Sequence, residues 1–102
     1  IVTSLVRFTC TSTPVLGLQS NISSVVRVGP GQFRVTWSSP YVSNNYLPMV
    51  SMIEDSSISS NNTTCYVRTI DTTNVLINVR GSDGNLIDAN EIMVTAYGEV
   101  TP

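Results

Sequence analysis

The sequence predicts an all-β domain, an antiparallel β-sandwich of jelly-roll-like type built from about seven short strands. Apolar and polar residues alternate with a period of two along several segments, and clusters of turn residues separate these segments at regular spacing. The chain is also 41% hydrophobic but only 12% charged, and it is rich in the Val, Ile and Thr that favour strands. Its 102 residues suffice for one core, so we expect a single domain spanning 1–102.

The first third of the chain is expected to hold two strands, at residues 2–11 and 22–28. Val6 and Phe8 share one face of the first strand. Residues 11–21 are predicted to be irregular, because a proline and a glycine interrupt them. The Gly-Pro-Gly-Gln sequence at 29–32 is typical of a short hairpin connection.

The middle of the chain contains a third strand at 33–37, a polar loop at 38–45 and a fourth strand at 46–53. Phe33, Val35 and Trp37 alternate with polar residues, as expected when one face of a strand is buried. The strand at 46–53 differs, because it is apolar on both faces. A sandwich covers only one of these faces, so the pattern predicts a second subunit on the other.

The last strands are expected at 64–70, 75–80 and 92–98. The first two form a hairpin around 71–74, and a turn at 81–85 precedes the last strand. Residues 75–79 and 92–94 are also apolar on both faces. Exposed patches of this kind are rare on soluble monomers, so an oligomer is favoured.

The composition argues against catalysis. The chain has no His, which excludes Ser–His–Asp and Cys–His nucleophilic catalysis in their usual form. Two distant cysteines do not make a zinc site, and the acidic residues near 83–91 do not have the spacing of a calcium loop. We therefore expect no enzyme activity, catalytic residue, metal or cofactor.

The charge and hydropathy of the chain argue against nucleic acid as a partner and against insertion into a membrane. The net charge is −2, and five arginines are scattered along a chain without lysine, which argues against nucleic-acid binding. No apolar run approaches the roughly 20 residues of a membrane span. Cys10 and Cys65 could form one disulfide or remain two buried thiols.

Aromatic residues are the remaining candidates for recognition. Tyr41, in the loop 38–45, is the best candidate for an exposed contact, and its alternative role is to plug one end of the sandwich. Tyr46, Tyr66 and Tyr97 fall in strands, where tyrosines are more often packing residues.

Several elements follow one another in a recognisable order. Residues 22–53 contain a strand, a Gly-containing turn, an alternating strand that ends in an aromatic residue, Ser39-Pro40, and a strand start at Asn45-Tyr46. Residues 75–98 add a strand, a Gly/Ser turn, Asp-Ala and a last strand. This pattern resembles a module common in bacteriophage tail fibres and related virion proteins. Pro48 and the long loop 54–63 depart from it.

The resemblance implies a homotrimeric domain at the distal end of a fibre, forming the carboxy-terminal part of a longer protein and assembled in the bacterial cytoplasm before it joins the virion. Its implied role is attachment to a glycan or protein receptor on the host. The expected trimer interface comprises Leu47, Met49, Leu76 and Met93.

Strand direction places the receptor site. If consecutive strands are antiparallel, loops 11–21, 38–45 and 71–74 share the end opposite to Ile1, where a shaft would attach. The predicted receptor-binding residues at this tip are Tyr41, Asn44, Asn45, Asp71 and Thr72. Two alternatives remain open: a capsid decoration or cement protein, and a carbohydrate-binding or adhesin-like β-sandwich module.

Overall fold

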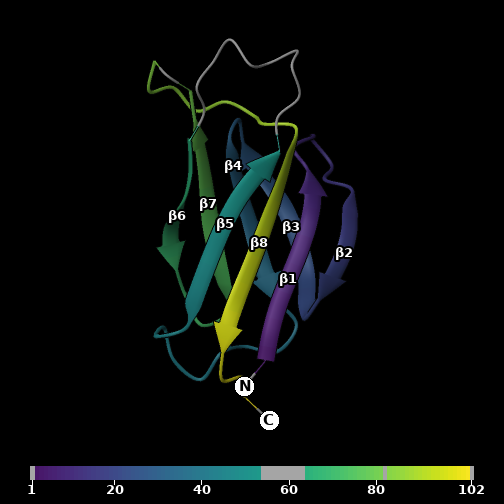
Figure 1. Cartoon of the computed structure of the whole chain (residues 1–102), viewed down its shortest axis with the longest axis vertical. Helices are drawn as coiled ribbons and strands as arrows, with labels where there is room; N and C mark the ends of the chain where they lie inside the picture. The colour runs from purple at the N-terminus through teal and green to yellow at the C-terminus, as the bar shows by residue number, and fades with distance from the viewer. Residues whose placement is uncertain (1, 54–63, 82, 102) are drawn as a thin grey trace.

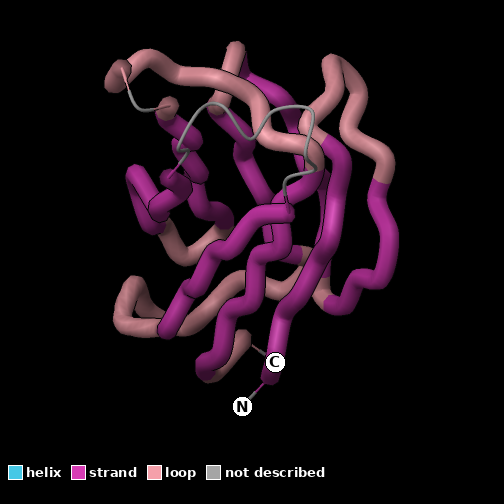
Figure 2. The backbone as a smooth tube through the Cα atoms, turned by 45° about the horizontal axis from the view of Figure 1, so that its top comes forward, coloured by secondary structure: helices cyan, strands magenta, loops and turns pink. Residues whose placement is uncertain are grey.

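The structure, a computed structural model, describes residues 2–53, 64–81 and 83–101. These residues form eight β-strands and no helix (Figures 1 and 2). All strand pairs are antiparallel, and the strands divide into two sheets of four. The predicted all-β antiparallel sandwich is confirmed.

The two sheets have different strand orders. Sheet A, in front in Figure 1, contains in spatial order β2 (Leu16–Ser20), β1 (Val2–Thr9), β8 (Glu91–Gly98) and β5 (Leu47–Ile53). Sheet B contains β3 (Ile22–Gly29), β4 (Gln32–Trp37), β7 (Asn74–Arg80) and β6 (Thr64–Ile70). The hairpins β1–β2, β3–β4 and β6–β7 each stay within one sheet, and the other connections cross between sheets.

Strand β2 corrects the prediction that residues 11–21 are irregular. It pairs antiparallel with β1 at the edge of sheet A, with Leu16 opposite Phe8. Four of its five residues are exposed, so its side chains lack the alternation that identifies a half-buried strand. Asn21 follows with φ of 58°, a left-handed conformation that asparagine tolerates, and turns the chain into sheet B.

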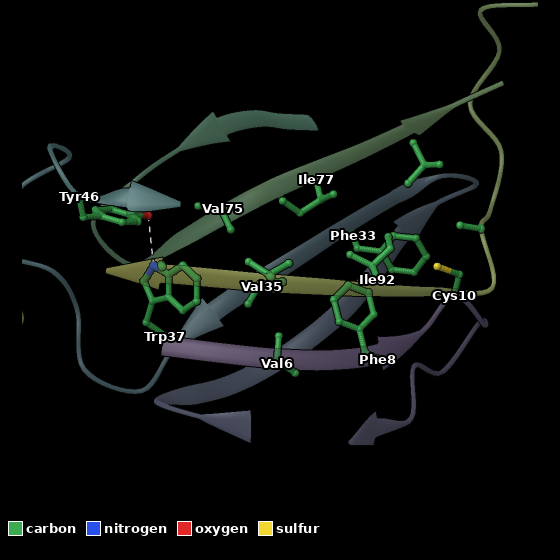
Figure 3. Packing of buried hydrophobic residues seen from close by; sticks show 14 of the residues in the cluster. Val6, Phe8, Cys10, Phe33, Val35, Trp37, Tyr46, Val75, Ile77 and Ile92 are labelled. Atoms are coloured by element: carbon green, nitrogen blue, oxygen red, sulfur yellow. Dashed lines mark hydrogen bonds between the residues drawn. The ribbon is translucent and has the colours of Figure 1, made fainter. Parts of the chain in front are cut away.

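The core lies between the two sheets and follows the predicted alternation. In β4, Phe33, Val35 and Trp37 are buried, and between the sheets the rings of Phe8 and Phe33 lie 5.4 Å apart (Figure 3). Burying each such side chain stabilises the fold by about 1.5–3 kcal/mol. The buried apolar residues are Val6, Phe8, Cys10, Phe33, Val35, Trp37, Tyr41, Tyr46, Val75, Ile77, Val79, Ala89, Ile92, Val94 and Ala96.

Strand β2 also changes which end of the sandwich carries the loops that the sequence assigns to the tip. Because β2 adds one reversal of direction, the loops 38–46 and 71–73 lie at the same end as Val2 and the carboxy-terminal residues (Figure 1). An isolated bridge between Tyr41 and Val100 joins the first loop to the end of the chain. The prediction that these loops lie opposite to the amino terminus is wrong.

The other end of the sandwich is closed by the connection from β7 to β8. Gly31, in the β3–β4 turn, donates its N–H to the Asp88 carboxylate at 2.8 Å, and its carbonyl accepts a hydrogen bond from Val79. Arg27 forms an ion pair with Asp88 at 2.7 Å. The turn and the connection are thus held together by one carboxylate. The loop 54–63, expected to be polar and irregular, lies outside the described residues.

Candidate functional site

The loops at the amino-terminal end are built around three aromatic rings. Tyr41 and Tyr46 stack with ring centroids 4.0 Å apart, and Trp37 meets both rings edge-on (Figure 3 shows Trp37 and Tyr46). Tyr41 is only 2% exposed. The prediction of an exposed Tyr41 is therefore wrong, and its alternative role as the plug of the sandwich is what the structure shows.

Hydrogen bonds explain why the Tyr41 side chain turns inward. Its hydroxyl lies 2.6 Å from the hydroxyl of buried Ser4 in β1, and Ser4 accepts a second hydrogen bond from the Asn21 amide. The other side of that amide accepts the N–H of Ser39. A buried phenol needs a partner, and Ser4 lies 37 residues away along the chain. No local pattern in the sequence indicates this pairing.

Tyr46 connects the aromatic cluster to the β6–β7 turn. Its hydroxyl donates to the carbonyl of Asp71 at 2.6 Å and accepts the indole N–H of Trp37 at 3.1 Å. Burial raises the pKa of the Tyr46 phenol above its usual value, because it disfavours the charged form. The expectation that Tyr46 is a packing residue agrees with its burial.

The structure brings the other predicted receptor residues to one end. Asn44, Asn45 and Asp71 are exposed, and Thr72 is half-buried. The Tyr41 N–H donates to the carbonyl of Thr72 at 2.9 Å, which joins the two loops. This end also carries the chain termini, so it is not the end opposite to the amino terminus, where a distal tip is expected. The receptor role of Asn44, Asn45, Asp71 and Thr72 stays a prediction.

The outer face of sheet A gathers three of the four expected interface residues. Leu47 pairs with Tyr97, Met49 with Thr95, and Ser51 with Met93 across β5 and β8, which places their side chains on the same face. Leu47 is 67% and Met49 60% exposed. Leu76 lies in sheet B, so the four residues do not form one surface.

A shallow groove of about 330 Å³ continues this face towards β2. Leu5, Leu18 and Met93 line it, with Arg7 at one side. Arg7 forms a bidentate pair with Glu91, at 2.9 and 2.8 Å. The hydrogen bonds from Arg7 lower the pKa of the Glu91 carboxyl below its usual value. The outer face of sheet A thus combines exposed apolar side chains with an apolar groove and one neutralised ion pair.

The described residues show no candidate metal site, no membrane-spanning helix and no disulfide. They contain no cluster of three His, Cys, Asp or Glu side chains that could hold a metal ion. No helix among them is long and apolar enough to cross a membrane. Cys10 is buried and Cys65 half-buried, and neither forms a disulfide.

Comparison with known proteins identifies no relative. No family model matches the chain, and no curated protein and no solved structure is similar to it.

Proposed function

We propose that the chain is a non-enzymatic domain of a bacteriophage tail fibre, which associates as a homotrimer and attaches the virion to the host surface. The order of strands and turns in residues 22–53 and 75–98 supports the assignment to a tail fibre. The main observation behind the proposed assembly is the apolar outer face of sheet A. Soluble monomers rarely expose a contiguous surface of this kind.

The assembly would place the three copies of sheet A around a threefold axis. Leu47 and Met49 protrude at the β5 side of the face, and the groove lined by Leu5 and Leu18 lies towards the opposite edge strand, β2. In a closed ring, each copy presents one part of its surface to a different part of the next copy. The β5 side chains of one copy would therefore enter the groove of its neighbour.

The solution mass tests the assembly. Light scattering on a sizing column should give three times the 11.0 kDa of one chain. The double variant Leu47→Ser, Met49→Ser should shift the protein to monomer, because it removes the protruding apolar groups.

The matched control is Val26→Ser, Val28→Ser, which removes two exposed apolar residues from β3 of sheet B and should leave the mass unchanged. A monomeric or dimeric parent protein at micromolar concentration would overturn the trimer.

The attachment role has its own test. If the domain binds the host receptor, the purified domain should occupy receptors and reduce adsorption of virions that carry the same fibre. Adsorption that is insensitive to saturating domain would argue against attachment, whatever the oligomeric state.

A further inference from the structure

The positive charges of this chain are concentrated in one sheet. Four of the five arginines lie in strands of sheet B, and these strands contain no Asp or Glu. Arg27 is paired with Asp88. Arg34, Arg68 and Arg80 form no ion pair with any carboxylate of the described residues. The arginines are far apart in the sequence, but the pairing of the strands places four of them in the same sheet.

The register places Arg34 and Arg68 on the outer face of sheet B. Arg34 is exposed between buried Phe33 and Val35, and it lies opposite Leu76 in β7. Leu76 in turn lies opposite Thr69, where a register shift inserts Arg68 into β6. The two arginines therefore flank Leu76, with backbones about 10 Å apart at the usual strand spacing.

The neighbouring row on this face is polar and held by hydrogen bonds. Gln32 donates to Asn78, and Asn78 donates to the hydroxyl of Tyr66 at 3.2 Å. The Arg80 guanidinium donates to the same hydroxyl at 2.8 Å and to the carbonyl of Gly84. Tyr66 is thus fixed in one orientation, and 36% of it remains exposed.

The electrostatics of Tyr66 agree with this geometry. The hydrogen bond from Arg80 lowers the pKa of the phenol most, followed by that from Asn78, and the charge of Arg68 contributes in the same direction. The guanidinium groups of Arg80 and Arg68 therefore both favour negative charge at the Tyr66 hydroxyl. Both would also attract an anion bound beside this ring.

We infer that the outer face of sheet B binds an acidic polysaccharide, with its carboxylates paired to Arg34 and Arg68 and a sugar ring lying on Tyr66. Guanidinium groups suit planar carboxylates, and the aromatic ring offers an apolar surface near the half-buried amide of Gln32. Because the Tyr66 ring is already held by hydrogen bonds, ordering of this ring adds little to the cost of binding. The inference rests on the proposed function only in taking the ligand from the host surface, and it needs no oligomer.

Two other anionic partners are less well matched. Duplex DNA is bound through many phosphate contacts, and three arginines supply only about three of them. An anionic bilayer attracts lysine- and arginine-rich segments, whereas this face adds to its three arginines a tyrosine ring that buried Asn78 and Arg80 hold in place. Both partners are outcomes of the test.

Binding of polygalacturonate oligosaccharides, measured by calorimetry, tests the inference with neutral dextran, a short DNA duplex and phosphatidylglycerol vesicles in parallel. We expect binding to polygalacturonate alone, weakened by salt. Arg34→Gln and Arg68→Gln should each reduce the affinity by about two- to fivefold, the size expected of one exposed ion pair. Tyr66→Ser should also reduce it.

The matched control is Gln19→Glu, which lowers the net charge by the same one unit at an exposed position of β2, in sheet A, and should leave the affinity unchanged. Equal losses for Gln19→Glu and Arg68→Gln, no binding to polygalacturonate, or a preference for DNA or vesicles would each overturn the inference. The solution mass, measured on the same samples, separates this failure from a failure of the proposed trimer.

Discussion

Tyr41 and Tyr46 stack at 4.0 Å with an angle of 10° between their rings, and Gly98 lies against both residues. A Cβ atom added at Gly98 would lie 2.7 Å from the Cβ of Tyr46 and 3.1 Å from two ring carbons of Tyr41. The loop between β4 and β5 therefore closes one end of the sandwich only because β8 ends in a residue without a side chain.

The first prediction concerns Gly98. Gly98→Ala should lower the free energy of unfolding by about 1–3 kcal/mol, because an overpacked site forces its neighbours to shift. Urea denaturation measures this. The control is Gly29→Ala, whose added Cβ would meet only the Gln32 side chain at 3.8 Å. Equal effects of the two substitutions would contradict the packing described for Gly98.

Tyr41 gives a second prediction, which separates a core role from a surface role. Tyr41→Ala should lower the free energy of unfolding by about 3–5 kcal/mol, the usual cost of removing a buried aromatic ring. The neighbouring Val42 is exposed, and Val42→Ala should change stability by less than about 0.5 kcal/mol. A Tyr41→Ala variant as stable as the parent protein would show that the ring is not part of the core.

The third prediction compares two glycines with positive φ. A Cβ at Gly31 (φ 68°) would lie 2.6–2.7 Å from backbone atoms of Val79 and Ile87, whereas a Cβ at Gly84 (φ 84°) would meet nothing within 4 Å. Gly84→Ala should cost about 1–2 kcal/mol from the backbone conformation alone. Gly31→Ala should cost more, because it adds a backbone clash. Thermal or urea unfolding of both variants checks the order, and the reverse order would refute it.

Much of the fold could be predicted because burial and alternation are directly linked. The side chains of Phe33, Val35 and Trp37 alternate with polar ones because one face of β4 packs against sheet A. The sequence predicts that the strand 46–53 is apolar on both faces. In the structure, Val50 and Met52 pack against the core, while Leu47 and Met49 are exposed. Side-chain patterns of this kind indicate which face of a strand is buried, but they do not indicate the order of the strands in a sheet.

What could not be predicted depends on pairings between distant residues. Strand β2 exists through backbone pairing with β1 and buries little side-chain surface, so its sequence lacks a strand pattern. That one strand reversed the assignment of the loops to the two ends. The burial of Tyr41 likewise depends on Ser4 and Gly98, and the clustering of Arg34 with Arg68 depends on a register shift in β6.

The fourth prediction concerns thiol reactivity. Burial raises the pKa of the Cys10 thiol to about 12, and the residue is 8% exposed. The reactive thiolate is therefore almost absent near neutral pH. Cys65 is half-buried, so an alkylating reagent should modify it faster than Cys10 in the folded protein, as mass spectrometry of the digested protein would show. In denaturant the two rates should converge. Faster labelling of Cys10 would contradict its burial.

The last prediction is a pH dependence set by Glu91. The hydrogen bonds from Arg7 lower the pKa of this carboxyl in the folded state, so on acidification the unfolded state takes up its proton first. The pair therefore stabilises the fold above the ordinary glutamate pKa of about 4.3, and this contribution is lost as the pH falls through the lower folded-state value. Urea unfolding at a series of pH values measures it. Glu91→Gln should flatten the acid limb of the stability profile, and Arg7→Gln should flatten it equally, because either change removes the pair. An acid limb unchanged in both variants would mean that other carboxylates account for the acid sensitivity.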